Sequence, residues 1–248
     1  MDGFSYNNIF ETKGIEYLAI IAFFAILIPF WIKLNKQVKI TKQIQKTLGS
    51  LTASAIRIPQ GLLFSENHTW THLERSGVAK VGLDDLLMHI TGEVKFNTLK
   101  IQGEKISKGD LLAEIDQKGK HLRIFSPISG DIIDKNPVLT DNPELINEDP
   151  YQKGWMYKIK PTNWIDDTNS YYLAGEATNW IEKELAMFKD FLVISMGKLT
   201  PSSTNLILQD GGELRDHILS DLPEEVWQQF QEDFLNNTNP GAKHRDLF

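Results

Sequence analysis

The chain has 248 residues, of which 41% are hydrophobic and 24% charged, and its formal net charge is −7. This composition is ordinary for a globular protein, excludes collagen-like and wholly disordered chains, and argues against nucleic acid as a partner. The chain contains no cysteine, which excludes disulfides, thiol catalysis, iron–sulfur ligation and zinc ribbons.

The first predicted element is a transmembrane helix. Residues 17–32 carry no charge and are almost all apolar. A bilayer span needs about 20 apolar residues, so the flanking residues extend the predicted helix to 15–33, behind an external tail over 1–14. A cleaved secretory signal is disfavoured because no basic region precedes the run and no small-residue cleavage site follows it. A buried soluble helix is disfavoured because the run is apolar on all sides beside a lysine cluster.

Lysines set the predicted orientation of this helix. One lysine precedes the apolar run, and five follow it: Lys33, Lys36, Lys39, Lys42 and Lys46. The positive-inside rule then places the N-terminus outside and the main domain in the cytoplasm, in a single-pass protein of the cytoplasmic membrane. Residues 34–61 are predicted to be a basic juxtamembrane linker. It is either a helix lying on anionic lipid or a solvated spacer whose lysines only set topology.

Short strands dominate the next region. Over residues 62–163, brief apolar or alternating runs lie between glycine and proline turn signals, which predicts a small antiparallel barrel or sandwich. One helix is expected over residues 83–90, because positions 83, 86, 87 and 90 are apolar. The clearest predicted strands are residues 77–81, 94–96, 111–115, 122–125, 130–133 and 155–159.

The same region carries short motifs in the order and close to the spacing of one known family. They are Ser65–Trp70, Gly77–Asp85, Gly92-Glu-Val94, Gly103–Asp110, Ser126–Gly130 and Asp141–Tyr151, followed by Gly154-Trp155. This set resembles the glycine cleavage system H protein, and the run from Asn142 to Tyr151 is its most specific part. The resemblance implies a lipoyl-type domain over residues 62–192. Its expected architecture is mainly β with added helices: two small antiparallel sheets packed as a barrel-sandwich hybrid.

The resemblance also implies a role and a site. Members of the family are carriers rather than enzymes: a lysine at a β-hairpin tip bears lipoic acid and moves aminomethyl groups and reducing equivalents among partner enzymes. An acidic residue stands three places before that lysine. Counting without a gap from Gly109 to Ser126 puts the acidic position on Asp116 and the lysine position on Gly119. Lys118 and Lys120 flank this glycine and are the candidate lipoyl attachment sites.

A shift by one place normally turns a side chain to the opposite face of a strand, although a turn can re-aim it. We therefore expect a tip without a lipoyl group, and an adaptor or docking protein in a membrane-associated assembly. The alternative is a lipoylated carrier modified on Lys118 or Lys120. We expect no metal site, because His68 and His72 have no third ligand at a recognisable spacing.

A C-terminal α/β extension is predicted over residues 193–248. Just before it, Thr178 is expected to cap a helix with the apolar stripe Ile181, Leu185, Phe188 and Leu192. Residues 204–208 suggest a strand, Asp221–Glu224 suggests a capping box, and residues 236–248 are polar and expected to fray. The following helix should bury one face, either on the barrel or under a partner protein: Val226, Trp227, Phe230 and Phe234.

Overall fold

The computed structural model describes residues 17–31, 50–199, 208–209 and 213–236, in two compact units divided after Gly49. In the first unit, residues 17–31 form a helix whose side chains are exposed. No helix in the described part of the chain is both long and apolar enough to cross a membrane. The remainder of the predicted tail and anchor, and the linker up to residue 49, lie outside the described residues.

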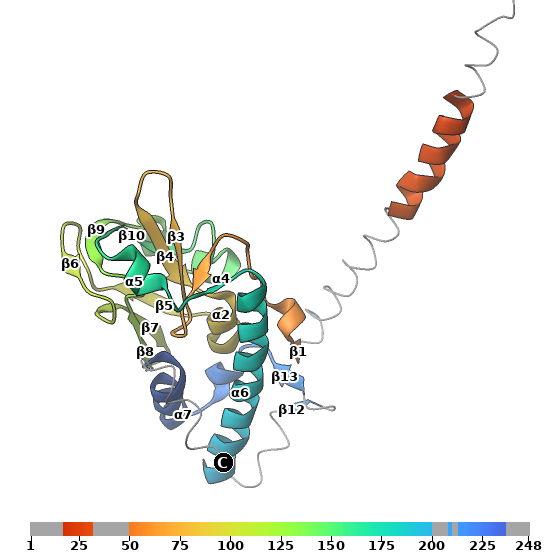
Figure 1. The fold of residues 1–248 in the computed structure, drawn as a ribbon. Coiled ribbons are helices and arrows are strands. Elements are labelled where there is room, and N and C mark those ends of the chain that lie inside the picture. The colour runs from red at the N-terminus through yellow and green to blue at the C-terminus, as the bar shows by residue number, and fades with distance from the viewer. Residues whose placement is uncertain (1–16, 32–49, 200–207, 210–212, 237–248) are drawn as a thin grey trace, which may run out of the picture. The chain divides into compact units, whose positions relative to one another are not determined.

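The second unit is built on two main antiparallel sheets (Figure 1), with strand orders β11-β2-β3-β4-β10-β9-β6 and β5-β7-β8. The mainly β architecture with added helices is confirmed, and each of the six predicted strands is present with ends displaced by at most two residues. The strands are β2 (Leu63–Phe64), β3 (Thr69–Leu73), β4 (Ala79–Leu83), β5 (Lys95–Thr98), β6 (Lys105–Ile106), β7 (Leu111–Gln117), β8 (Lys120–Phe125), β9 (Gly130–Lys135), β10 (Trp155–Pro161) and β11 (Tyr172–Leu173).

Both sheets contribute to one hydrophobic core. The inward residues of β4, β7, β8 and β10 are almost fully buried, as the alternation along half-buried strands requires. Tyr157 on β10 joins the sheets, because its buried hydroxyl donates to the Leu112 carbonyl of β7 at 3.0 Å and accepts from Lys100 N at 2.9 Å. The hairpin β7–β8 is therefore fixed at its base by the larger sheet.

Short helices close the ends of the sheets. The helix predicted over 83–90 is confirmed as α2 (Asp85–Thr91), which begins after Asp84 because that side chain accepts a hydrogen bond from Leu87 N at 2.8 Å. The other short helices of this region are η1 (Ala53–Ala55), α3 (Val138–Asp141), α4 (Leu145–Glu148) and α5 (Trp164–Thr168).

The long helix α6 (Gly175–Leu199) corrects one prediction and confirms another. Thr178 does not cap it, because the helix begins three residues earlier and the Thr178 hydroxyl donates to the Ala174 carbonyl at 3.3 Å. The predicted apolar stripe is buried as expected. The domain boundary predicted after residue 192 falls inside this helix.

The C-terminal extension folds back on the body. Its strand β13 (Glu213–Arg215) pairs with β12 (Leu208–Gln209) and with β1 (Ser50–Leu51), and η3 (Ile218–Asp221), α7 (Glu224–Phe230) and the π-helical η4 (Gln231–Leu235) follow. The predicted capping box is wrong: α7 starts after Pro223 without a side-chain cap, and Asp221 pairs with Arg215 instead. Residues 204–207 and 237–248 of the predicted extension lie outside the described residues.

The predicted apolar face of α7 is buried on the body itself. Trp227 and Phe230 are fully buried and Phe234 is 5% exposed. Phe230 packs against Phe188 and Phe191 of α6, with ring centres 5.6 and 6.1 Å apart. Of the two predicted alternatives, packing on the barrel and its flanking helix therefore describes this face.

Candidate functional site at a hairpin tip

The site is the tip of the β7–β8 hairpin, where a two-residue turn links Gln117 to its partner Lys120. Lys118 and Gly119 occupy this turn with φ angles of 54° and 86°. Two positive φ values are the signature of a type I′ turn, which matches the twist of the flanking strands and favours glycine at its second position. The structure thus places Lys118 and Gly119 in an exposed two-residue turn between antiparallel strands, whereas Asp116 and Gln117 belong to β7 and Lys120 and His121 belong to β8.

The two lysines beside Gly119 lie in different surroundings. Lys118 is exposed. Lys120 is half-buried, and its Nζ donates to the carbonyls of Ser220 at 2.6 Å and Leu222 at 3.0 Å. The same ammonium lies 5.1 Å from the centre of the Trp227 ring, a cation–π contact. Burial, together with the nearby charge of Lys118, lowers the pKa of Lys120. Lys120 is therefore bound to the C-terminal extension, whereas Lys118 projects at the tip.

Two further residues of the hairpin lie next to the turn and make contacts that hold it in place. Gln117 points inward and donates through its amide to the carbonyls of Thr91 at 2.6 Å and Glu93 at 3.0 Å, at the end of α2. Asp116, the residue at the predicted acidic position, lies opposite His121, and its carboxylate is 3.4 Å from the imidazole. The tip is thus a rigid support for whatever side chain it presents.

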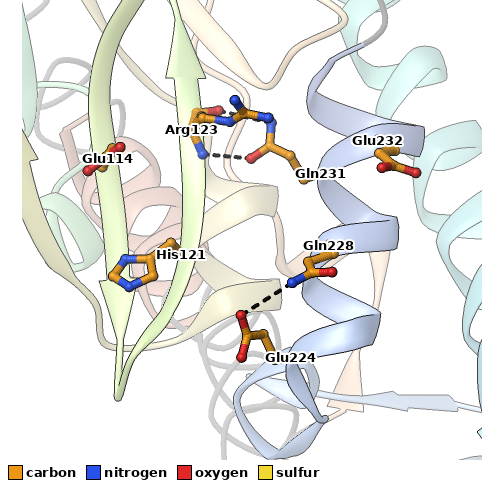
Figure 2. Close-up of a pocket in the computed structure, with 7 residues that line it drawn as sticks. All are labelled: Glu114, His121, Arg123, Glu224, Gln228, Gln231 and Glu232. Carbon is orange, nitrogen blue, oxygen red and sulfur yellow. Dashed lines mark hydrogen bonds between the residues drawn. The ribbon is translucent and has the colours of Figure 1, made fainter.

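A cleft of about 600 Å³ separates the hairpin from α7 and η4. Figure 2 shows Glu114, His121 and Arg123 on the hairpin wall, and the side chains of the C-terminal helices on the other. Gln231 reaches across: its Oε1 accepts from Arg123 N at 2.6 Å and its Nε2 donates to the Arg123 carbonyl at 3.2 Å. Since β8 is the last strand of its sheet, this amide pairs backbone groups at an open edge.

The two histidines considered as metal ligands do not converge. His68 lies in the turn before β3 and is fully buried, with Nδ1 2.8 Å from the Asp84 carboxylate and its ring 5.4 Å from that of Trp180. His72 is exposed on β3 and bonds to the Gly61 carbonyl. Within the described ranges there is no group of three residues that could hold a metal ion.

A charged cluster fastens the start of this unit to its C-terminal extension. The buried Asp85 carboxylate accepts from Arg57 Nη2 at 2.7 Å and from Arg57 N at 2.8 Å. His89 lies between two carboxylates, with Nε2 3.6 Å from Asp85 and Nδ1 2.8 Å from Asp216. Burial alone would lower the pKa of His89, but Asp216 and Asp85 outweigh it and raise the pKa to about 9.

This cluster makes stability depend on pH. The pKa of His89 is raised above its unfolded value, so its contribution is fully present below about pH 6.5 and is lost as pH rises through about 9. We expect the parent to lose roughly 2 kcal/mol more than a His89→Asn variant between pH 6 and pH 10 in urea denaturation. Equal losses in the two proteins would contradict this role.

The glycine cleavage H-protein family matches residues 62–184. The chain is 36% identical to a probable glycine cleavage system H protein of Thermococcus kodakarensis over 107 residues, which is 43% of this chain and 79% of that protein. It is 34% identical to the glycine cleavage system H protein of Bacteroides fragilis over 114 residues, 46% and 90% of the two chains. A crystal structure of the H protein from Mycobacterium marinum is 26% identical, covers 50% of this chain and 98% of its own, and gives a TM-score of 0.44.

Proposed function

Because the chain belongs to the glycine cleavage H-protein family, we propose that it is a non-catalytic docking member of this carrier family, with no lipoyl group at its hairpin tip. In this proposal it acts as an adaptor for partner proteins in a membrane-associated assembly. Its N-terminal segment holds it at the membrane, and the rigid hairpin and the extension packed beside it present the docking surface.

One observation carries the proposal: the lysine position counted from the family's motifs falls on Gly119, which lies in the two-residue turn at the hairpin tip. Neither neighbouring lysine, Lys118 or Lys120, occupies the position of the missing lysine. The Lys120 ammonium donates hydrogen bonds to two carbonyls of the extension. Acylation would remove its positive charge and leave a single N–H, which could not make both bonds. Lys118 lies one place earlier, at the first position of the turn.

The extension supports a docking role. It approaches the domain at two separate points, since Gln231 pairs with the edge of β8 while Asn67, in the first family motif, donates to the Leu235 carbonyl at 2.6 Å. Residues 185–248 lie beyond the family match, so this surface is an addition to the carrier domain. An added surface beside the tip suits a module that binds partners through contacts rather than through a swinging arm.

The alternative function is a lipoylated carrier, and the exposure of Lys118 favours it specifically. A free ammonium at the end of a rigid hairpin is the presentation that attachment of a swinging arm requires. Peptide mass spectrometry of residues 111–125 separates the two functions, because one lipoyl group adds about 188 Da. An unmodified peptide supports docking, and a modified Lys118 supports the carrier.

For the tether, we expect the full chain to sediment with membranes and its body to face the cytoplasm. The reason is the uncharged run over residues 17–32 and the lysines that follow it. A variant lacking residues 1–33 should move to the soluble fraction. The measurement is membrane fractionation with protease protection. A body that resists protease added on the cytoplasmic side of the membrane would contradict the predicted orientation. A full chain that stays in the soluble fraction would contradict the tether.

A further inference from the structure

The point where the chain enters its second unit is paired with the C-terminal extension. Ser50 and Leu51 of β1 lie opposite Arg215 and Leu214 of β13. Leu51 and Leu214 are both almost fully buried, so this short pairing is also a packing contact. Any displacement of β1 therefore exposes apolar surface on β13 and removes one of its two ladder partners, the other being β12.

The segment after β13 is held against α2 by the charged cluster. His217 N donates to the His89 carbonyl at 2.7 Å, and the His89 side chain bonds to Asp216 at 2.8 Å. The other nitrogen of His89 faces Asp85, which holds Arg57. His217 has a φ angle of 60°, in the left-handed region that costs a non-glycine residue energy. The segment thus depends on these contacts to keep a strained turn.

The same segment ends on the hairpin. The carbonyls of Ser220 and Leu222 are those that bind the Lys120 ammonium. Between the two ends, Ile218 and Leu219 are buried, and the Leu219 carbonyl accepts from Trp227 Nε1 at 2.7 Å. Residues 213–222 therefore form one continuous segment of ten residues, which is paired with β1 at its start and binds Lys120 at its end.

We propose that residues 213–222 form a latch, which couples the entry of the chain at residues 50–57 to the hairpin tip. While β1 and Arg57 are in place, the carbonyls of the latch keep the Lys120 ammonium bound and inaccessible. A force or a partner that pulls β1 away loosens the latch and releases the Lys120 ammonium at the tip. Helix α7 stays docked meanwhile, because Trp227 and Phe230 remain in the core. The proposal does not depend on lipoylation or on the membrane tether.

Amine acylation of the full chain, followed residue by residue with mass spectrometry, tests this coupling. An acetyl N-hydroxysuccinimide ester reacts with free, neutral lysine amines. In the parent protein we expect Lys120 to react about tenfold more slowly than Lys118, since reaction requires local opening of the latch. Two variants weaken the latch at its end away from the hairpin: Asp216→Asn removes the carboxylate charge that faces His89, and Leu51→Pro disrupts the pairing of β1 with β13. Both should raise the Lys120 rate at least about threefold and leave Lys118 unchanged.

Matched controls separate coupling from general damage. Glu74→Gln removes one carboxylate from the ion pair with Lys80, and Leu173→Pro disrupts β11, another two-residue edge strand. Neither should alter Lys120. Lys108 donates to the Asp167 carbonyl at 2.6 Å, so a rise in its rate reports lost fold. If the Lys108 rate shows that Leu51→Pro is unfolded, the proposal is judged on the near-isosteric Asp216→Asn variant alone. Equal rates for Lys118 and Lys120 in the parent, or an unchanged Lys120 in the folded latch variants, would overturn the proposal.

Discussion

A Trp227→Ala substitution is expected to lower the free energy of unfolding by about 3–5 kcal/mol, the range for removing a large buried aromatic side chain. Trp227 is fully buried, its indole nitrogen donates to the Leu219 carbonyl at 2.7 Å, and its ring faces the Lys120 ammonium. The change leaves a cavity beneath the latch segment, and it removes one of the two hydrogen bonds that the Leu219 carbonyl accepts; the other comes from Leu222 N at 3.1 Å. Chemical denaturation of the purified variant measures the loss.

Gln228, the next residue on the same helix, offers the control. Its side chain is exposed and bonds only along the helix, to Glu224 at 3.2 Å, among the contacts described. Gln228→Ala should therefore change stability by less than about 0.5 kcal/mol. A loss below about 1 kcal/mol for Trp227→Ala would mean that the aromatic face is not a core, and would favour a partner-binding surface instead.

A Gly119→Lys substitution is expected to turn an unmodified tip into a lipoylated one. It places a lysine three residues after Asp116, at the apex of the turn, as the family's pattern requires. A Cβ at this position meets no atom within 4 Å, but the φ angle of 86° strains any residue other than glycine. The expected cost is about 1–2 kcal/mol of stability, which the fold should tolerate.

The readout is the mass of the variant after co-expression with a lipoyl-attaching enzyme. We expect a gain of about 188 Da in Gly119→Lys. Gly119→Gln carries the same backbone strain without an amine, and should gain nothing. A Gly119→Lys protein that remains unmodified while a family H protein is modified in the same cells would show that register is not what excludes the lipoyl group.

The hairpin and the family domain could be predicted because their signals are local. Lys118 and Gly119 indicate the turn, because they lie between strands whose apolar residues alternate. The family domain is indicated by motifs that are each only a few residues long. The burial of Trp227 and its neighbours followed from helical periodicity in the same way. Each of these features depends on residues close together in the sequence.

What the sequence did not reveal depends on distant contacts. Lys120 and Gln231 acquire their roles from partners about 100 residues away, bonded mostly through backbone carbonyls that any sequence supplies. The prediction that Thr178 and Asp221 cap helices is wrong, because threonine and aspartate side chains can also bond to a backbone carbonyl or to an arginine. Thr178, inside α6, donates to the carbonyl of Ala174, the residue just before the helix, and Asp221 pairs with Arg215.

The intact mass of the full chain, purified from its native host, tests most directly whether the hairpin tip carries a lipoyl group. We expect one species at the mass of the unmodified sequence, 28.3 kDa, apart from processing at the N-terminus. A species heavier by about 188 Da, with the addition mapped to Lys118 or Lys120, would exclude an unmodified tip and establish the carrier function instead.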